Sequence, residues 1–427
     1  MKPRVGLVCQ RNNNIPFVFD VAARHGIELI DIFARGENPQ PDQIALCDRL
    51  ELDVFDAPDA ALDALEAWAR DNRLDGVMTS REEAIVWTAR AAQRLGLPGI
   101  NPQAADAARN KAEARRLMQK AGCNVPAFLD YRGPQDDAAL AEMDYPYVVK
   151  PKAAFGSAGV TLVTCDADRD AALAQVLNMC RTQFDRFAPE TAGQGVLIES
   201  FIDGCEYVAE CFAVDGVQHV VSLGFKGDPR GPFFEETVYL APAQLPREIA
   251  DRMVDEAKKG MAALGLTHGP GHCEMRLTAE GVPFILEIGA RVGGSGSCHF
   301  VVEQSTGFDF FGAQLRQALG ECLENVPHVP QPVAYASNYI VPLGGSGRLS
   351  RVDGLEKAEA HPDVVRLMRF LPDGTEVRPY PEFSGFIAFV FGRHDSYEAG
   401  LAQFDWLSHT IRPKWDTLDV ALPLIPR

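Results

Sequence analysis

The sequence predicts a protein of mixed class, α/β in its N-terminal region and α+β in the remainder, and three observations support this prediction. The first hundred residues alternate between short apolar runs and segments with helical periodicity. From about residue 147 onward, strand patterns are separated by turn-forming residues. The length of 427 residues suits two or three domains, because a typical domain has roughly 100–200 residues.

The N-terminal region predicts a parallel sheet covered by helices. We expect strands at 5–9, 27–33 and 75–79, and a weaker strand at 54–55. We expect helices between them at 17–25, 60–70 and 82–95. Strands that alternate with helices are typical of parallel sheets. A dinucleotide site is not expected here, because no GxGxxG motif follows the first strand.

Turn-forming residues divide the rest of the chain. Residues 97–102 are rich in proline and glycine, which predicts a boundary. We expect helices at 110–121 and near 396–407, and strands near 147–151, 160–163, 196–199 and 207–214. The proline-rich segment 326–333 predicts a linker. The predicted domains are therefore 1–104, 105–320 and 321–427.

Composition narrows the function classes. The formal net charge is −18, which disfavours binding to nucleic acid or to an anionic membrane. No stretch approaches the ~20 apolar residues of a membrane helix, and the apolar run at 5–9 is too short for the core of a signal peptide. The ten scattered cysteines form no CxxC pair, which suits free thiols in a reducing compartment. We therefore expect a cytoplasmic protein that acts on small molecules.

Two glutamates flank a predicted β-hairpin. If Glu280 and Gly281 form a two-residue turn, Glu274 lies directly opposite Glu287. Opposed like charges repel, and a divalent cation held by both carboxylates would compensate. Mg²⁺ bound together with nucleotide phosphates fits best. The alternative is two solvated glutamates on an exposed hairpin.

An arginine and a glycine-rich turn follow this hairpin. Arg291 comes four residues after Glu287, and residues 293–296 are Gly-Gly-Ser-Gly. An arginine beside a bound metal can stabilise negative charge that develops on a phosphate or a tetrahedral oxyanion. The alternative is a salt bridge from Arg291 to one of the two glutamates.

A lysine and a small-residue loop form a second candidate phosphate site. Lys150 ends an apolar strand, and the loop 156–159 follows closely. Such a loop can cover phosphates with its N–H groups, although the chain has no Walker A motif and the loop could be an ordinary tight turn. In the segment 197–207, Glu199 and Glu206 could accept hydrogen bonds from an adenine amine or from ribose hydroxyls. The alternative for that segment is a simple hairpin.

In this order and spacing, these segments resemble the signature of ATP-grasp ligases over roughly residues 105–320. The features that carry the resemblance are Lys111, the strand 148–151, the loop 156–159, Glu199 with Glu206, and Glu274 with Glu287. The resemblance implies an ATP-grasp fold with a lid at about 125–200. It also implies a preceding parallel-sheet domain and a C-terminal α+β domain that closes the acceptor site. ATP and Mg²⁺, or Mn²⁺, are the implied cofactors, and a homodimer is possible by the same resemblance.

The resemblance also implies roles for individual residues. Lys111 and Lys150 contact the ATP phosphates, and Glu274 and Glu287 bind the metal. Arg291 stabilises the acyl-phosphate and the tetrahedral intermediate. The other implied ATP contacts are the lid loop Gly156, Ser157, Ala158 and Gly159, the adenine contacts Glu199, Phe201 and Ile202, and the ribose contact Glu206.

Within the superfamily, the sequence is most similar to L-amino-acid ligases of the bacilysin-synthetase type. This similarity implies an ADP-forming ligase that joins a carboxylate to an amine, with amino acids as the expected substrates. The implied substrate contacts are Glu236, Tyr239, Arg291, Gly294 and Ser295, although Glu236 could instead be a solvated acidic strand end. Two alternatives stay open: a carboxylase that acts through carboxyphosphate, and a non-catalytic nucleotide-binding protein.

Three positions depart from the patterns of related enzymes. Gly289 stands where many ATP-grasp enzymes have a metal-binding asparagine. His272 stands where some D-alanine ligases have a catalytic arginine, a role that Arg291 could take. Ser295 is small where dipeptide ligases of this type can have a bulky residue, which predicts more room for a substrate side chain.

Overall fold

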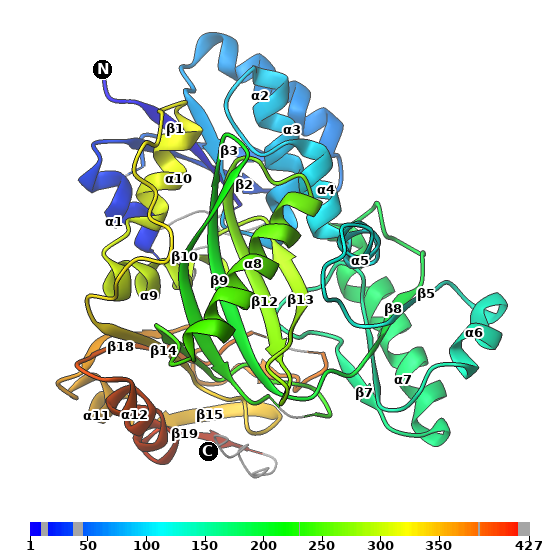
Figure 1. The fold of residues 1–427 in the computed structure, drawn as a ribbon. Helices are drawn as coiled ribbons and strands as arrows, with labels where there is room; N and C mark the ends of the chain where they lie inside the picture. The colour runs from blue at the N-terminus through cyan, green and yellow to red at the C-terminus, as the bar shows by residue number, and fades with distance from the viewer. Residues whose placement is uncertain (10–15, 37–45, 230, 383–384, 417–427) are drawn as a thin grey trace.

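A computed structural model describes residues 1–9, 16–36, 46–229, 231–382 and 385–416. Its strands form four sheets, and the largest of them runs through the centre of the molecule (Figure 1). All ten cysteines lie in the described ranges and are free thiols. Within those ranges, no helix combines the length and the apolar character needed to cross a membrane.

The N-terminal sheet is parallel, as predicted, with the strand order β3-β2-β1-β4. Its strands are β1 (Arg4–Val8), β2 (Glu28–Ala34), β3 (Asp48–Leu52) and β4 (Gly76–Met78). Its helices are α1 (Phe17–Arg24), α2 (Pro58–Asp71) and α3 (Ile85–Leu95). The strand predicted at 54–55 is wrong, because these residues follow β3. An edge strand has only one hydrogen-bonded neighbour and can be polar, so β3 gives little apolar signal.

Two short helices connect this region to the next sheet. These are α4 (Pro102–Arg109) and α5 (Lys111–Lys120), and an asparagine caps each one. The side chain of Asn110 accepts hydrogen bonds from the amides of Ala112 and Glu113, at 3.1 and 3.3 Å. This cap fixes the start of α5 and places Lys111 at its first turn.

The second sheet contains four antiparallel strands in the order β5-β8-β6-β7. The strands are β5 (Phe128–Tyr131), β6 (Tyr147–Lys150), β7 (Thr161–Val163) and β8 (Val196–Ser200). The helices α6 (Asp137–Ala141) and α7 (Asp166–Met179) accompany this sheet, which lies to one side of the central sheet (Figure 1). It presents Lys150 and Glu199 toward the centre of the molecule.

The central sheet has eight antiparallel strands in the order β13-β12-β9-β10-β11-β14-β18-β16. They are β9 (Cys205–Val214), β10 (Val217–Gly227), β11 (Val238–Ala241), β12 (Gly269–Leu277), β13 (Pro283–Gly289), β14 (Tyr335–Ile340), β16 (Val364–Arg369) and β18 (Ala388–His394). The helix α8 (Arg247–Ala263) crosses the face formed by β9, β10, β12 and β13 (Figure 1). The helices α9 (Ser297–Thr306) and α10 (Phe310–Ala318) follow β13. Because β11 pairs with β14, one sheet runs continuously across residue 320.

The last part of the chain adds a small sheet beside the central one. It contains β15 (Gly347–Asp353), β17 (Glu376–Val377) and β19 (Arg412–Trp415), with the helices α11 (Leu355–Glu359) and α12 (Tyr397–Thr410). A buried apolar cluster that includes Leu240, Tyr339, Val390 and Phe404 joins these elements to the central sheet. The C-terminal region is therefore packed against the sheet that carries the candidate site.

Candidate active site

A cleft lies between the second sheet and the central sheet. It is lined by nearly all the residues predicted from the sequence, and the two that do not line it are Gly159 and Tyr239. The predicted residues that line the cleft are Lys111, Lys150, Gly156, Ser157, Ala158, Glu199, Phe201, Ile202, Glu206, Glu236, Glu274, Glu287, Arg291, Gly294 and Ser295. Segments far apart in the sequence therefore meet at one place.

The β12–β13 hairpin places Glu274 directly opposite Glu287, as predicted. The predicted turn is wrong, however. The amide of Thr278 donates to the carbonyl of Val282 at 3.1 Å, so the loop contains three residues and ends at Gly281, whose φ is +73°. A bulge at Leu286 then shifts the register by one residue and restores the pairing of the two glutamates.

Each of these carboxylates is paired with a lysine. Glu287 Oε1 lies 2.9 Å from Lys111 Nζ, and Glu274 Oε1 lies 2.6 Å from Lys226 Nζ. Lys226 Nζ also lies 3.1 Å from a carboxylate oxygen of Glu206 and 3.3 Å from one of Glu236. Burial lowers the pKa of Lys226, but the three carboxylates outweigh it and hold that pKa well above its usual range.

The sequence analysis missed Lys226. The signal was available, because Lys226 comes near the end of the largely apolar strand β10, as Lys150 does at the end of β6. Its side chain is 7% exposed. The structure thus adds a third lysine, which pairs with three carboxylates that line the cleft but does not itself line it.

Glu199 has a different environment from the one implied at the adenine. Its carboxylate is 1% exposed and forms ion pairs with Lys150 and Arg115. Arg115 also donates to the carbonyl of Leu286, the bulged residue of β13. Burial raises the pKa of Glu199, but Arg115 and Lys150 outweigh this effect and hold it below the ordinary value. Glu199 therefore positions Lys150 and, through Arg115, links the second sheet to the β12–β13 hairpin.

The loop 156–159 is held by the C-terminal region. The hydroxyl of Tyr380 donates to the carbonyl of Gly156 at 3.2 Å. The amide of Gly159 donates to the carbonyl of Pro381 at 2.9 Å. Gly159 thus contributes a backbone contact behind the loop rather than part of the cleft wall.

An arginine lies beside a stacked pair of aromatic rings where the adenine site was expected. The guanidinium carbon of Arg276 is 5.0 Å from the ring centre of Phe201 and 5.1 Å from that of Phe234. Arg276 also donates to the carbonyl of Ile202 at 2.9 Å. Arg276 was missed, although alternate residues of a strand share one face and His272, Glu274 and Arg276 alternate along β12.

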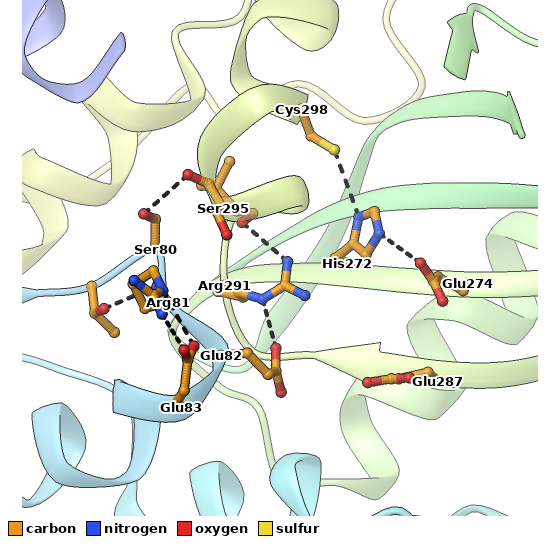
Figure 2. A network of polar contacts seen from close by, with 12 residues as sticks. Ser80, Arg81, Glu82, Glu83, His272, Glu274, Glu287, Arg291, Ser295 and Cys298 are labelled. Atoms are coloured by element: carbon orange, nitrogen blue, oxygen red, sulfur yellow. Dashed lines mark hydrogen bonds and ion pairs between the residues drawn. The ribbon is translucent and has the colours of Figure 1, made fainter. Parts of the chain in front are cut away.

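His272 connects Glu274 of the β12–β13 hairpin to a buried acidic residue. Its Nε2 lies 3.1 Å from Glu274 Oε1, and its Nδ1 lies 2.9 Å from Glu210 Oε1. Burial lowers the pKa of His272, but Glu210 and Cys298 outweigh it, and the pKa is well above its usual range. Figure 2 shows His272 between Glu274 and Cys298.

Tyr239 does not line the cleft, which corrects its predicted place among the substrate contacts. It is 4% exposed, and its hydroxyl donates to Glu210 Oε1 at 3.2 Å. Strand β11 pairs with β10 on one side and β14 on the other, so this tyrosine is enclosed in the core. Tyr239 supports Glu210, which in turn holds His272.

Arg291 forms an ion pair, but with neither of the glutamates considered from the sequence. Its Nε donates to Glu82 Oε2 at 2.6 Å (Figure 2). Glu82 belongs to the short 3₁₀ helix η1 (Glu82–Ala84) of the N-terminal region. Burial lowers the pKa of Arg291, whereas Glu82 and Glu287 raise it, and the net direction is upward. The N-terminal region therefore contributes a side chain to the site.

The same ion pair accounts for Gly289. A Cβ at this position would lie 3.1 Å from Glu82 Oε2 and 3.6 Å from the guanidinium carbon of Arg291. The space that an asparagine would need is thus next to these two side chains. The neighbouring turn is held separately, since the hydroxyl of Ser80 donates to the carbonyl of Ser295 at 3.3 Å (Figure 2).

Comparison with known proteins agrees with this arrangement. The chain matches the ATP-grasp N-terminal domain over residues 19–99, the ATP-grasp domain over 143–299, and the L-amino acid ligase C-terminal domain 2 over 340–416. The crystal structure of an L-amino acid ligase from Bacillus licheniformis is 34% identical, with a TM-score of 0.89. That match covers 97% of this chain and 99% of the ligase.

Two further relatives match a shorter region. Alanine–anticapsin ligase from Bacillus subtilis (strain 168) is 29% identical over 52% of this chain and 49% of its own length. Carnosine synthase 1 from Gallus gallus is 30% identical over 53% of this chain and 25% of its own length. The chain belongs to the L-amino acid ligase family, a group of ATP-dependent carbon–nitrogen ligases with the ATP-grasp fold.

Proposed function

We propose that this ligase joins the carboxylate of one amino acid to the amine of another through an acyl-phosphate, with release of ADP and phosphate. The observation that carries the proposal is one cleft lined by opposed carboxylates, two lysines and an arginine, with a third lysine paired to the carboxylates of its wall. The carboxylates are those of Glu274 and Glu287, and the cations are Lys111, Lys150, Lys226 and Arg291.

The first step would join two anions, so it requires positive charge. A carboxylate oxygen of the acid forms a bond to the γ-phosphorus of ATP, and the bond from that phosphorus to the β–γ bridging oxygen breaks to release ADP. The lysines and Arg291 lie where they can neutralise the phosphate oxygens during this transfer. Their pairing with Glu199, Glu274 and Glu287 keeps them in place before ATP binds.

In the second step, the amine nitrogen forms a bond to the acyl carbon, and the bond from that carbon to the phosphate oxygen breaks. The amine loses a proton and inorganic phosphate leaves. We assign Arg291 to the negative charge on the acyl oxygen, with Glu82 holding its guanidinium at the cleft wall. Glu236, Gly294 and Ser295 line the same cleft and are the proposed amino-acid contacts.

The metal site is proposed on the chemistry of its donors. Mg²⁺ prefers carboxylate and phosphate oxygens, and Glu274 and Glu287 present carboxylates from adjacent strands into one cleft. When bound, Mg²⁺ would neutralise phosphate charge. Lys111 and Lys226, which now pair with these glutamates, are close enough to the site to donate hydrogen bonds to phosphate oxygens instead.

The loop 156–159 is the proposed shield for the acyl-phosphate. A reactive acyl-phosphate must be kept from water, and a loop over the cleft does this in many phosphoryl-transfer enzymes. The hydrogen bonds from Tyr380 and to Pro381 support this role, since they hold the loop against the C-terminal region. Phe386 of that region also lines the cleft.

The test is ADP and phosphate release from MgATP with an array of paired L-amino acids, and with bicarbonate in a separate arm. We expect release that depends on an amino acid, with a dipeptide identified by mass spectrometry. Release with bicarbonate alone would contradict the proposal in favour of carboxylation. Release with an amino acid but with no condensed product in any pair would also contradict it.

A further inference from the structure

A second cavity lies where the N-terminal region meets the segment that precedes β8. Its walls come from the turn after β3, from α3 and α4, and from the short helix η4 (Asp185–Phe187). It shares no lining residue with the ATP cleft. The second cavity is therefore separate from the site described above.

A buried arginine with open donors lies in the wall of this cavity. Arg109, the last residue of α4, is only 2% exposed. Within the described part of the chain, its Nε and Nη1 atoms are buried and have no hydrogen-bond partner. A buried guanidinium with unsatisfied N–H groups is costly, and an anion that accepts from them would remove that cost.

Carboxylates lie in the same wall. Glu190 has a buried Oε1 atom with no partner among the described residues, and Asp106 lies at the exposed rim, three residues before Arg109. Burial raises the pKa of Glu190, and the nearby charge of Arg109 opposes that effect. Arg109 and Glu190 are thus close enough to interact electrostatically, but no hydrogen bond joins them in the structure.

Three other charged groups of this wall already have partners, and Asp106 lies at the exposed rim. Arg186 pairs with Asp56, with its Nε 2.7 Å from Oδ1, and Arg90 pairs with Asp59. Glu83 pairs with Arg81. Among the described residues of this wall, Arg109 and Glu190 are therefore the ones with buried polar atoms that lack a hydrogen-bond partner.

The rest of the wall is aromatic and aliphatic. Phe55 and Phe187 contact each other edge to face, with ring centres 4.8 Å apart. Val86 and Trp87 lie on the same wall, and the indole of Trp87 donates to the carbonyl of Pro58 at 3.1 Å. An apolar group that enters the cavity would pack against these side chains.

We propose that this cavity is a second amino-acid site, in which Arg109 binds the carboxylate, Glu190 binds the ammonium group, and an apolar side chain packs against Phe55 and Phe187. A zwitterion suits the cavity because its carboxylate can accept hydrogen bonds from Arg109 and its ammonium group can donate to Glu190. An amino acid with an apolar side chain also supplies a group that can pack against the aromatic part of the wall. Since the walls belong to two regions of the chain, an occupant would hold them together. Binding is expected without ATP, so this proposal can be tested independently of the proposed reaction.

The experiment is equilibrium dialysis of the full-length protein without ATP, using radiolabelled L-phenylalanine as the probe. The variant is Arg109→Gln, and the matched control is Arg94→Gln. Arg94 is on α3, and its ion pairs with Asp63 and Glu66 lie on the surface, away from the cavity. We expect Arg109→Gln to weaken one class of binding sites at least tenfold, and Arg94→Gln to leave it unchanged. Equal stoichiometry and affinity in the wild type and Arg109→Gln would overturn the proposal.

Two analogues and a second variant test the two ends of the ligand. N-acetyl-L-phenylalanine lacks the ammonium charge and phenethylamine lacks the carboxylate, so both are expected to bind this site at least tenfold more weakly. Equal binding of N-acetyl-L-phenylalanine would overturn the zwitterion assignment. If Arg109→Gln does not fold, Glu190→Gln replaces it. Glu190→Gln should weaken the binding of L-phenylalanine but not the binding of N-acetyl-L-phenylalanine. Unchanged L-phenylalanine binding would overturn the proposal.

Discussion

At the scale of single residues, the charge balance of the cleft depends on Lys226. Its one ammonium group faces carboxylates of Glu206, Glu236 and Glu274, and its side chain is 7% exposed. Removal of one partner from a buried ionic cluster leaves the other charges without compensation. Lys226 is therefore expected to affect both stability and catalysis.

We predict that Lys226→Gln lowers the free energy of unfolding by on the order of 3 kcal/mol, because three carboxylates then lose their cation. Urea denaturation in the absence of ATP measures this loss. The control is Lys259→Gln, since Lys259 is half-exposed and pairs only with Glu256 on its own helix. Equal midpoints for the two variants would show that Lys226 is not needed to balance the cluster.

We predict that Glu287→Gln lowers the rate of ADP formation at least 100-fold and leaves the fold intact. The amide can still accept from Lys111, but it supplies no charge to a metal. The measurement is ADP release under saturating MgATP, with circular dichroism to confirm folding. The control is Glu280→Gln, in the exposed turn of the same hairpin. Near-normal turnover of Glu287→Gln would remove this residue from the metal site.

At the scale of elements, the β12–β13 hairpin shows both the reach and the limit of prediction from sequence. Strand alternation predicted that Glu274 and Glu287 share a face, and they do. The turn was predicted one residue too short, and the bulge at Leu286 compensated for that error. A bulge has little local signal, and here the carbonyl of the bulged Leu286 accepts a hydrogen bond from Arg115 of a distant helix.

A motif also could not predict the buried side chains that support the cleft without lining it. A motif identifies residues that contact a ligand, whereas Glu210 and Tyr239 are buried and act on His272. Arg276 and His272 could have been found, because they alternate with Glu274 along β12. The alternation shows which face a residue shares, but it does not show which partner it meets.

The loop 156–159 carries a prediction at this scale. Tyr380→Phe removes the hydrogen bond to the Gly156 carbonyl and keeps the buried ring, so the cost is about 1 kcal/mol, or roughly fivefold. We expect the ratio of ATP hydrolysed to amide formed to rise by about that factor, because the acyl-phosphate is less well shielded. Coupled assays of ADP and product measure the ratio. An unchanged ratio would show that this contact does not control the loop. Tyr335→Phe, outside the cleft, is the matched control.

At the scale of the whole molecule, all regions of the chain contribute to one cleft. The N-terminal region supplies Glu82 to Arg291, and the C-terminal region supplies Phe386 and the contacts behind the loop. The residues of each such pair are more than 200 positions apart, and neither belongs to a shared motif. The sequence therefore predicted most of the residues that line the cleft and few of the contacts between regions.

Glu235 makes one of these contacts, and it predicts how stability changes with pH. Its carboxylate accepts from the amide of Leu343 at 2.7 Å, and burial raises its pKa to about 7. Because the folded state keeps a proton that the unfolded chain releases near pH 4.5, this group's contribution to stability is complete below pH 4.5. It is lost as the pH rises through about 7.

Glu235→Gln stays neutral and can still accept from Leu343, so the variant should lack this loss. We expect the wild type to lose on the order of 2 kcal/mol of stability relative to Glu235→Gln between pH 5 and pH 8, since each pKa unit corresponds to about 1.4 kcal/mol. Urea denaturation at both pH values measures the difference. The adjacent Glu236 titrates in both proteins, so its effect cancels. Glu356→Gln, exposed on α11, controls for the removal of one charge. If the wild type and Glu235→Gln show parallel pH profiles, the Glu235 carboxylate is already ionised in the folded protein at pH 5, and its environment is wetter than its burial indicates.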